Sequence, residues 1–106
     1  MTTFDDREKA FENKYAHDEE MRFRAQARRD RLLGLWAAGL MGLEGDAAAD
    51  YARSIVVEDL KEAGDDDVYR KVKADMEAKN LSTDGLRAKM EELLIEAKVQ
   101  VMGEVE

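Results

Sequence analysis

The longest apolar run in the chain, residues 32–43, sets the first limit on the fold. It contains no charged residue and holds Trp36, the only tryptophan of the 106 residues. Twelve residues are too few to cross a bilayer as a helix, which takes about 20 apolar residues. The run therefore predicts a buried part of a small helical core, and no direct membrane insertion is expected.

The charge composition further limits the fold class and the kind of partner. Charged residues make up 40% of the chain, hydrophobic residues 44%, and the formal net charge is -8. This composition is typical of long helices with solvated faces around one small core. The acidic balance argues against nucleic acid as a partner, because most of the surface would repel phosphate.

Proline and cysteine are both absent. Without proline, only glycine and turn residues end a helix. Without cysteine there is no disulfide, thiolate zinc site or cysteine nucleophile. The first ten residues are acidic and no apolar segment follows them, so no signal peptide is expected and the predicted location is cytoplasmic.

After residue 20, apolar residues recur at helical spacing in four segments, which predicts an all-α, small four-helix bundle. The predicted buried stripes are Ala25, Leu32, Trp36 and Leu40, broadened by Leu33, Ala37 and Met41; Ala48, Ala52, Ile55, Val56 and Leu60; Val68, Val72 and Met76; and Leu86, Met90, Leu93, Leu94, Ala97 and Val101. Tyr51 and Tyr69 are expected at the edge of this core.

Capping residues predict where these helices begin and end. The first is expected to end near Gly42 or Gly45, where glycine adopts the left-handed cap. Asp46 is expected to cap the second, which would end at residues 63–64. Residues 65–67, all aspartates, are expected to begin the third. Ser82 is expected to cap the last helix, which would fray after Gly103.

The first twenty residues form a flexible, helix-prone arm in this interpretation, and residues 21–106 form the bundle domain. Phe4, Phe11 and Tyr15 recur at i, i+7 and i+11, on one helical stripe. Asp5 favours the helix N-terminus. These three side chains provide too little apolar surface to stabilise an isolated helix. We therefore expect the arm to become helical when it binds in a partner's groove. No helix breaker separates it from the next segment, which allows one continuous helix on binding.

Five arginines lie between residues 22 and 31, against one acid, Asp30. Arg24, Arg28 and Arg31 follow helical spacing. They either balance the acidic bundle from its solvent face, pairing with Asp30 or Glu20, or form a docking patch for an acidic protein surface. A third interpretation is weak binding of an anion such as a nucleotide phosphate, with Trp36 or Phe23 stacking nearby.

Catalytic and metal-binding patterns are missing from the sequence. His17 is the only histidine, and its acidic neighbours at 18–20 point to other helix faces, so no metal site is expected. Three glycines are spaced by three residues: Gly39, Gly42 and Gly45. No strand precedes them and no phosphate-binding lysine follows, so they do not form a nucleotide-binding motif and are interpreted as helix packing and a turn. We expect neither enzymatic activity nor a cofactor.

Three strings are unusual for a simple bundle: FDDRE at residues 4–8, the arginine-rich stretch leading into LLGLWAAGLMG, and EAGDDDV at residues 62–68. With them, residues 2–43 and 51–72 resemble the ζ inhibitor subunit of the α-proteobacterial F-type ATP synthase. The resemblance implies a four-helix globular part and a mobile N-terminal arm. In that family the arm inserts as a helix between the catalytic α and β subunits, near γ, and blocks ATP hydrolysis.

The resemblance therefore implies that residues 2–19 are the inhibitory segment and that α, β and γ are the partners. From residue type, Phe4, Phe11 and Tyr15 would be apolar anchors in the groove, and Arg7, Lys9 and Lys14 would pair with acids. The protein would be a monomer when free, attached to the inner membrane only through the ATP synthase. The alternative is a helical interaction or scaffold domain that binds an unrelated groove.

Overall fold

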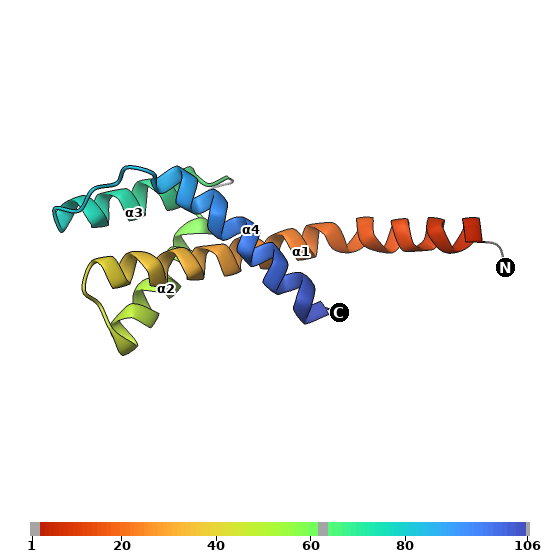
Figure 1. Ribbon diagram of the computed structural model, residues 1–106, viewed down its shortest axis with the longest axis horizontal. Helices are drawn as coiled ribbons and strands as arrows, with labels where there is room; N and C mark the ends of the chain where they lie inside the picture. Colours follow the sequence, from red (N-terminus) through yellow and green to blue (C-terminus); the bar gives the residue numbers. More distant parts are fainter. Residues whose placement is uncertain (1–2, 62–63, 106) are drawn as a thin grey trace.

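Four helices make up the computed structural model, which describes residues 3–61 and 64–105, and side chains from 19 to 61 and from 64 to 104. They are α1 (Thr3–Leu40), α2 (Gly45–Asp59), α3 (Asp66–Ala78) and α4 (Leu86–Val105) (Figure 1). No strand occurs in these residues. The predicted all-α, four-helix class is confirmed.

Helix α1 organises the molecule. Its 38 residues correspond to about 57 Å at 1.5 Å per residue, close to the 62 Å length of the whole chain. The red-to-orange part of α1 runs clear of the other three helices (Figure 1). Its second part packs along α2 and α4, while α3 packs mainly on α2. One uninterrupted helix thus joins the predicted arm to the bundle.

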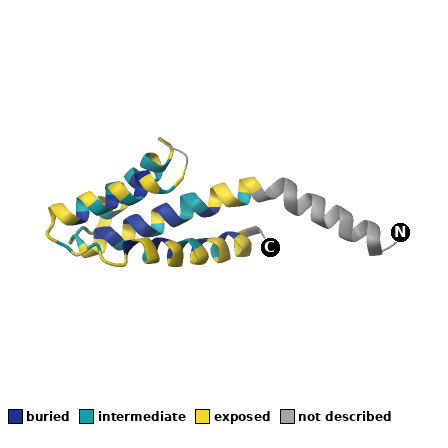
Figure 2. Cartoon of the chain, turned by 90° about the horizontal axis from the view of Figure 1, so that it is seen from above, coloured by how far each residue is buried: buried dark blue, intermediate teal, exposed yellow. Residues whose placement is uncertain are grey.

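The core lies where the second part of α1 meets the other helices, as the dark blue residues in Figure 2 show. Predicted stripe residues are fully buried on every helix, among them Leu33, Ile55, Val72 and Met90. Trp36, Tyr51 and Tyr69 pack against this core while partly exposed, as predicted. The Tyr51 hydroxyl donates a hydrogen bond of 2.8 Å to Asp75, so the polar end of this partly buried side chain has a partner.

Gly34 permits a close contact between α1 and α2. A Cβ built on Gly34 would lie 2.6 Å from Cα of Ala52, closer than any real Cβ contact. Glycine at this position therefore lets α1 and α2 approach backbone to backbone. The sequence interpretation assigned packing to Gly39 instead, and this was wrong: no atom lies within 4 Å of a Cβ there.

Two helices end in the same hydrogen-bonded turn. After α1, Gly42 has φ +81° and the Leu43 N–H donates to the Ala38 carbonyl at 2.8 Å. This is a Schellman cap, and it confirms the predicted glycine cap. After α3, Asn80 takes the same left-handed role at φ +60°, and the Leu81 N–H bonds to the Met76 carbonyl at 3.0 Å.

Three predicted boundaries are corrected by the structure. Glu44, not Asp46, is the N-cap of α2, and α2 ends at Asp59 because the next two N–H groups bond only three residues back and tighten the turn. Ser82 does not cap α4. Gly85, at φ +78°, interrupts the helical backbone, so α4 begins at Leu86, and the Ser82 hydroxyl accepts the Asp84 N–H instead.

The end of α4 and two predicted core positions also differ. Helix α4 continues past Gly103 to Val105. Leu40 is 48% exposed because it lies in the last turn of α1, at the edge of the bundle. Leu60 is 66% exposed because α2 has already ended before it. Residues 65–67 do begin the third helix, as predicted, with Asp65 as its N-cap.

Candidate functional site

The arginine-rich segment of α1 lies where the helix leaves the bundle. Arg24 is exposed and its guanidinium pairs with Glu20 at 3.0 Å, one turn earlier on the same helix. This is the surface pairing that the sequence favoured. An exposed pair of this kind contributes about 0.3–0.5 kcal/mol, so it does little to hold the segment in place.

Arg28 instead reaches across to α4. Its guanidinium donates to the side-chain oxygen of Gln100 at 2.9 Å and also pairs with Glu104. Arg24, Arg28 and Arg31 line one open cavity of about 370 Å³, whose other walls are Ala27, Val56, Val101 and Glu104. The structure thus brings the three predicted patch residues together.

The aromatic residues of the anion hypothesis lie elsewhere. Trp36 does not line this cavity and packs on the core, with the Lys89 ammonium 5.6 Å from its ring centre. Phe23 lines a different pocket. Neither predicted stacking partner lines the cavity of the three arginines, and the patch itself stays a prediction.

Arg29 differs from its neighbours because it is buried, with only 1% of its surface exposed. Its Nε donates to Asp30 at 2.7 Å and its terminal nitrogen donates to Asp65 at 2.7 Å. Asp59 lies 4.0 Å away. Since Asp59 ends α2 and Asp65 caps α3, this one guanidinium links three helices. Burial lowers the Arg29 pKa, but the hydrogen bonds and charges of Asp65 and Asp30 raise it more.

Asp30 is fully buried beside this guanidinium. Burial, and secondarily the facing Asp59 carboxyl, raise the pKa of Asp30 to about 8, against the opposing effect of Arg29. Asp30 Oδ1 accepts the Arg29 bond, whereas Oδ2 has no hydrogen-bond partner in the described part of the chain. Near neutral pH, Asp30 therefore holds a proton in the folded protein.

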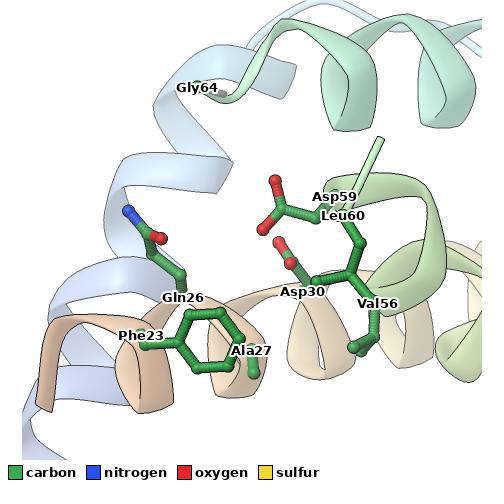
Figure 3. Close-up of a pocket in the computed structure, with 8 residues that line it drawn as sticks. All are labelled: Phe23, Gln26, Ala27, Asp30, Val56, Asp59, Leu60 and Gly64. Atoms are coloured by element: carbon green, nitrogen blue, oxygen red, sulfur yellow. The ribbon is translucent and has the colours of Figure 1, made fainter. Parts of the chain in front are cut away.

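The Asp30 and Asp59 carboxyls face each other at one end of a pocket between α1 and α2 (Figure 3). The pocket measures about 280 Å³. Its remaining walls are largely apolar: Phe23, Ala27, Val56, Leu60 and Gly64, with the Gln26 amide beside them. The site combines an apolar opening with an acidic end.

The predicted arm residues belong to the first part of α1, but their side chains lie outside the described residues. They are Phe4, Asp5, Arg7, Lys9, Phe11, Lys14 and Tyr15. The side chain of His17 lies outside them as well. Within the described residues there is no group of three His, Cys, Asp or Glu side chains suited to a metal, and no helix long and apolar enough to span a membrane.

The buried charge cluster was missed from the sequence, although a signal for it was present. Arg29 lies four residues after Ala25 and four before Leu33, so it falls on the buried stripe of α1. An arginine at that position needs buried acidic partners. Its partners Asp59 and Asp65 come from other helices, which the spacing along α1 does not indicate.

Comparison with known proteins decides the family. The family model for ATPase inhibitor subunit zeta matches residues 1–100. The chain belongs to the ATPase inhibitor subunit zeta family. The match covers both α1 and the bundle, and the resemblance noted in the sequence is confirmed. A family of inhibitor subunits points to a regulatory role toward an ATPase.

A solved structure supports the fold. The chain is similar to a protein studied by solution NMR, with 46% sequence identity and a TM-score of 0.71. The similarity covers 79% of this chain and 98% of that one. No curated protein matches the chain.

Proposed function

We propose that this zeta-family chain inhibits ATP hydrolysis by an F-type ATP synthase, with its N-terminal arm as the inhibitory element. Family membership supports the inhibitor role. The observation that carries the arm's part is the form of α1, a continuous helix of which one half is packed and the other runs clear of the bundle (Figure 1). Residues 1–20 act as the arm and residues 21–106 as the bundle that holds it.

The proposed mechanism is a helix inserted in a groove between catalytic α and β subunits, near γ. Phe4, Phe11 and Tyr15 lie at helical spacing and fill the groove, the usual arrangement for helix recognition. Three basic residues pair with acids of the partner: Arg7, Lys9 and Lys14. Hydrolysis stops because the inserted helix keeps the catalytic interface from opening, so the inhibitor needs no catalytic group of its own.

The bundle makes the arm effective. Since the second half of α1 is held by α2 and α4, a docked bundle presents the arm at a high local concentration to its groove. In this proposal the protein acts on the cytoplasmic face of the membrane and is attached there only through the enzyme. Co-purification of α, β and γ subunits with the tagged chain tests these partners, and their absence would favour an unrelated groove.

Replacement of two arm aromatics tests the mechanism. Phe4→Ala with Phe11→Ala should raise the concentration needed for half-maximal inhibition at least tenfold, because hot-spot aromatics each contribute about 2 kcal/mol or more. The melting temperature should change by less than about 2 °C, since residues 4 and 11 belong to the part of α1 that runs clear of the bundle (Figure 1). The matched control is Ile95→Ala with Val99→Ala, two residues of α4 that are 65% and 66% exposed. Equal inhibition by the arm variant and the control would contradict the proposal.

A further inference from the structure

The pocket between α1 and α2 has the chemistry of a socket for a cation with an aliphatic stem. Its acidic end holds Asp30 and Asp59, and Asp65 lies on the other side of Arg29. Three carboxyl groups therefore share one buried guanidinium in the described residues, so the acidic groups outnumber the single basic group even with Asp30 protonated. A buried charge excess favours any cation that reaches it.

One buried atom identifies where the cation would bind. Asp30 is fully buried and lines the pocket, and its Oδ2 has no hydrogen-bond donor among the residues that the structure describes. Asp59, with 16% of its side chain exposed, faces it. Two carboxyl groups side by side offer acceptors for a guanidinium or ammonium group.

The pocket walls separate an organic cation from a metal ion. A hydrated metal ion needs several oxygen ligands, whereas the described lining provides two carboxyl groups, one amide and mostly apolar carbon. Ala27, Val56 and Leu60 suit the methylene stem of an arginine or lysine side chain, which packs along apolar surface with its charge beyond it.

The rim indicates a protein as the source of that cation. Phe23 and Leu60 line the pocket and are 62% and 66% exposed, and Val57, three residues before Leu60 in the sequence, is 58% exposed. Large exposed apolar side chains around a pocket with an acidic end are typical of a protein interface, in which an arginine anchor is surrounded by apolar contacts. A small cation alone would leave this rim in water.

We propose that the pocket between α1 and α2 receives an arginine or lysine side chain of the inhibited ATPase and so anchors the bundle beside the arm. The proposal rests on the proposed function for the identity of the partner. The cation preference of the pocket rests on the geometry alone. Two experiments separate these claims.

The first experiment measures the pocket in the isolated chain. n-Butylguanidinium is titrated while the backbone amide resonances of Ala27, Asp30, Val56 and Leu60 are followed by NMR. We expect saturable shifts, and at least tenfold weaker binding of the neutral isostere n-butylurea. Asp59→Asn should weaken n-butylguanidinium binding at least fivefold, whereas Asp50→Asn, an exposed acid on the same helix, should not. Equal binding of the two ligands, or of the two variants, would overturn the cation site.

The second experiment measures inhibition of the ATPase. Asp59→Asn should raise the concentration for half-maximal inhibition about tenfold and Asp50→Asn should leave it unchanged. Leu60→Ala should weaken inhibition two- to threefold, against no change for Ile95→Ala, a residue of nearly equal exposure on α4. Unchanged inhibition by both pocket variants would overturn the ATPase as the source of the cation. Complete lack of inhibition by the unmodified chain would refute the proposed function and this partner, while the n-butylguanidinium result would still decide the pocket.

Discussion

The two halves of α1 share one backbone and differ in what surrounds them. The second half, from about Ala25 onward, has one stripe of side chains buried against the bundle, with Leu33 and Ala37 in the core. The first half runs clear of the bundle (Figure 1). The comparison shows that the sequence pattern sets which part of one helix packs in the bundle and which part runs clear of it.

The arginines mark the change from one half to the other. Arg24 is exposed and pairs along its own helix, whereas Arg29, a little more than one turn later, is buried and pairs with residues near two other helices' ends. Within one short segment, one arginine is therefore exposed to solvent and another is buried in the bundle. Substitutions on either side of this change provide ways to test it.

The largest expected effect comes from Arg29→Ala. It removes the buried guanidinium that Asp30 and Asp65 share as a hydrogen-bond donor, and removing one partner of a buried pair costs about 3 kcal/mol or more. The free energy of unfolding, measured with urea, should fall by that amount. Arg24→Ala, which breaks an exposed pair, should cost less than about 1 kcal/mol. Similar losses for the two variants would contradict the division of α1.

Gly34→Ala should have the next largest effect. The added methyl would meet the backbone of Ala52, and overpacking of this kind costs about 1–3 kcal/mol. Gly39→Ala, five residues later in open space, should stabilise the protein by about 0.5–1 kcal/mol, because alanine is the better helix former. Chemical denaturation of the two variants in parallel measures the change in the free energy of unfolding and its sign for each. A stabilised Gly34→Ala variant would disprove the close contact.

The last prediction concerns a pH dependence that arises from Asp30. Its folded pKa of about 8 lies above the ordinary 3.8, so the folded state binds the extra proton between these values. The resulting stability is complete below about pH 4 and is lost as pH rises through 8. We expect the free energy of unfolding to decrease as pH rises from 5 to 8, with a slope of at most about 1.4 kcal/mol per pH unit, the limit for one bound proton. Asp30→Asn should remove this slope in thermal melts, and an unchanged slope would assign it to other groups.

Much of the fold could be predicted because helical periodicity is a local property. The stripe of α3, Val68, Val72 and Met76, was predicted completely and is fully buried. The glycine cap at Gly42 was predictable because glycine adopts the left-handed conformation more readily than other residues. Leu40 and Leu60 were misplaced because a stripe does not show where the neighbouring helix stops covering it.

The site was less predictable because its contacts join distant parts of the chain. Helical spacing grouped Arg24, Arg28 and Arg31, which do share one cavity. The same spacing could not show that Asp59 and Asp65 close around Arg29, since these acids come from the ends of other helices. Gly34 was missed for the same reason, as its role depends on the approach of Ala52.

The central claim is that the two halves of α1 have separate roles, inhibition and folding. The most direct test compares residues 21–106 with the full chain in an ATP hydrolysis assay on the purified cognate F-type ATP synthase. We expect the shortened chain to melt cooperatively within a few degrees of the full one and to lose inhibition. A folded, shortened chain that inhibits as strongly as the full protein would contradict the account.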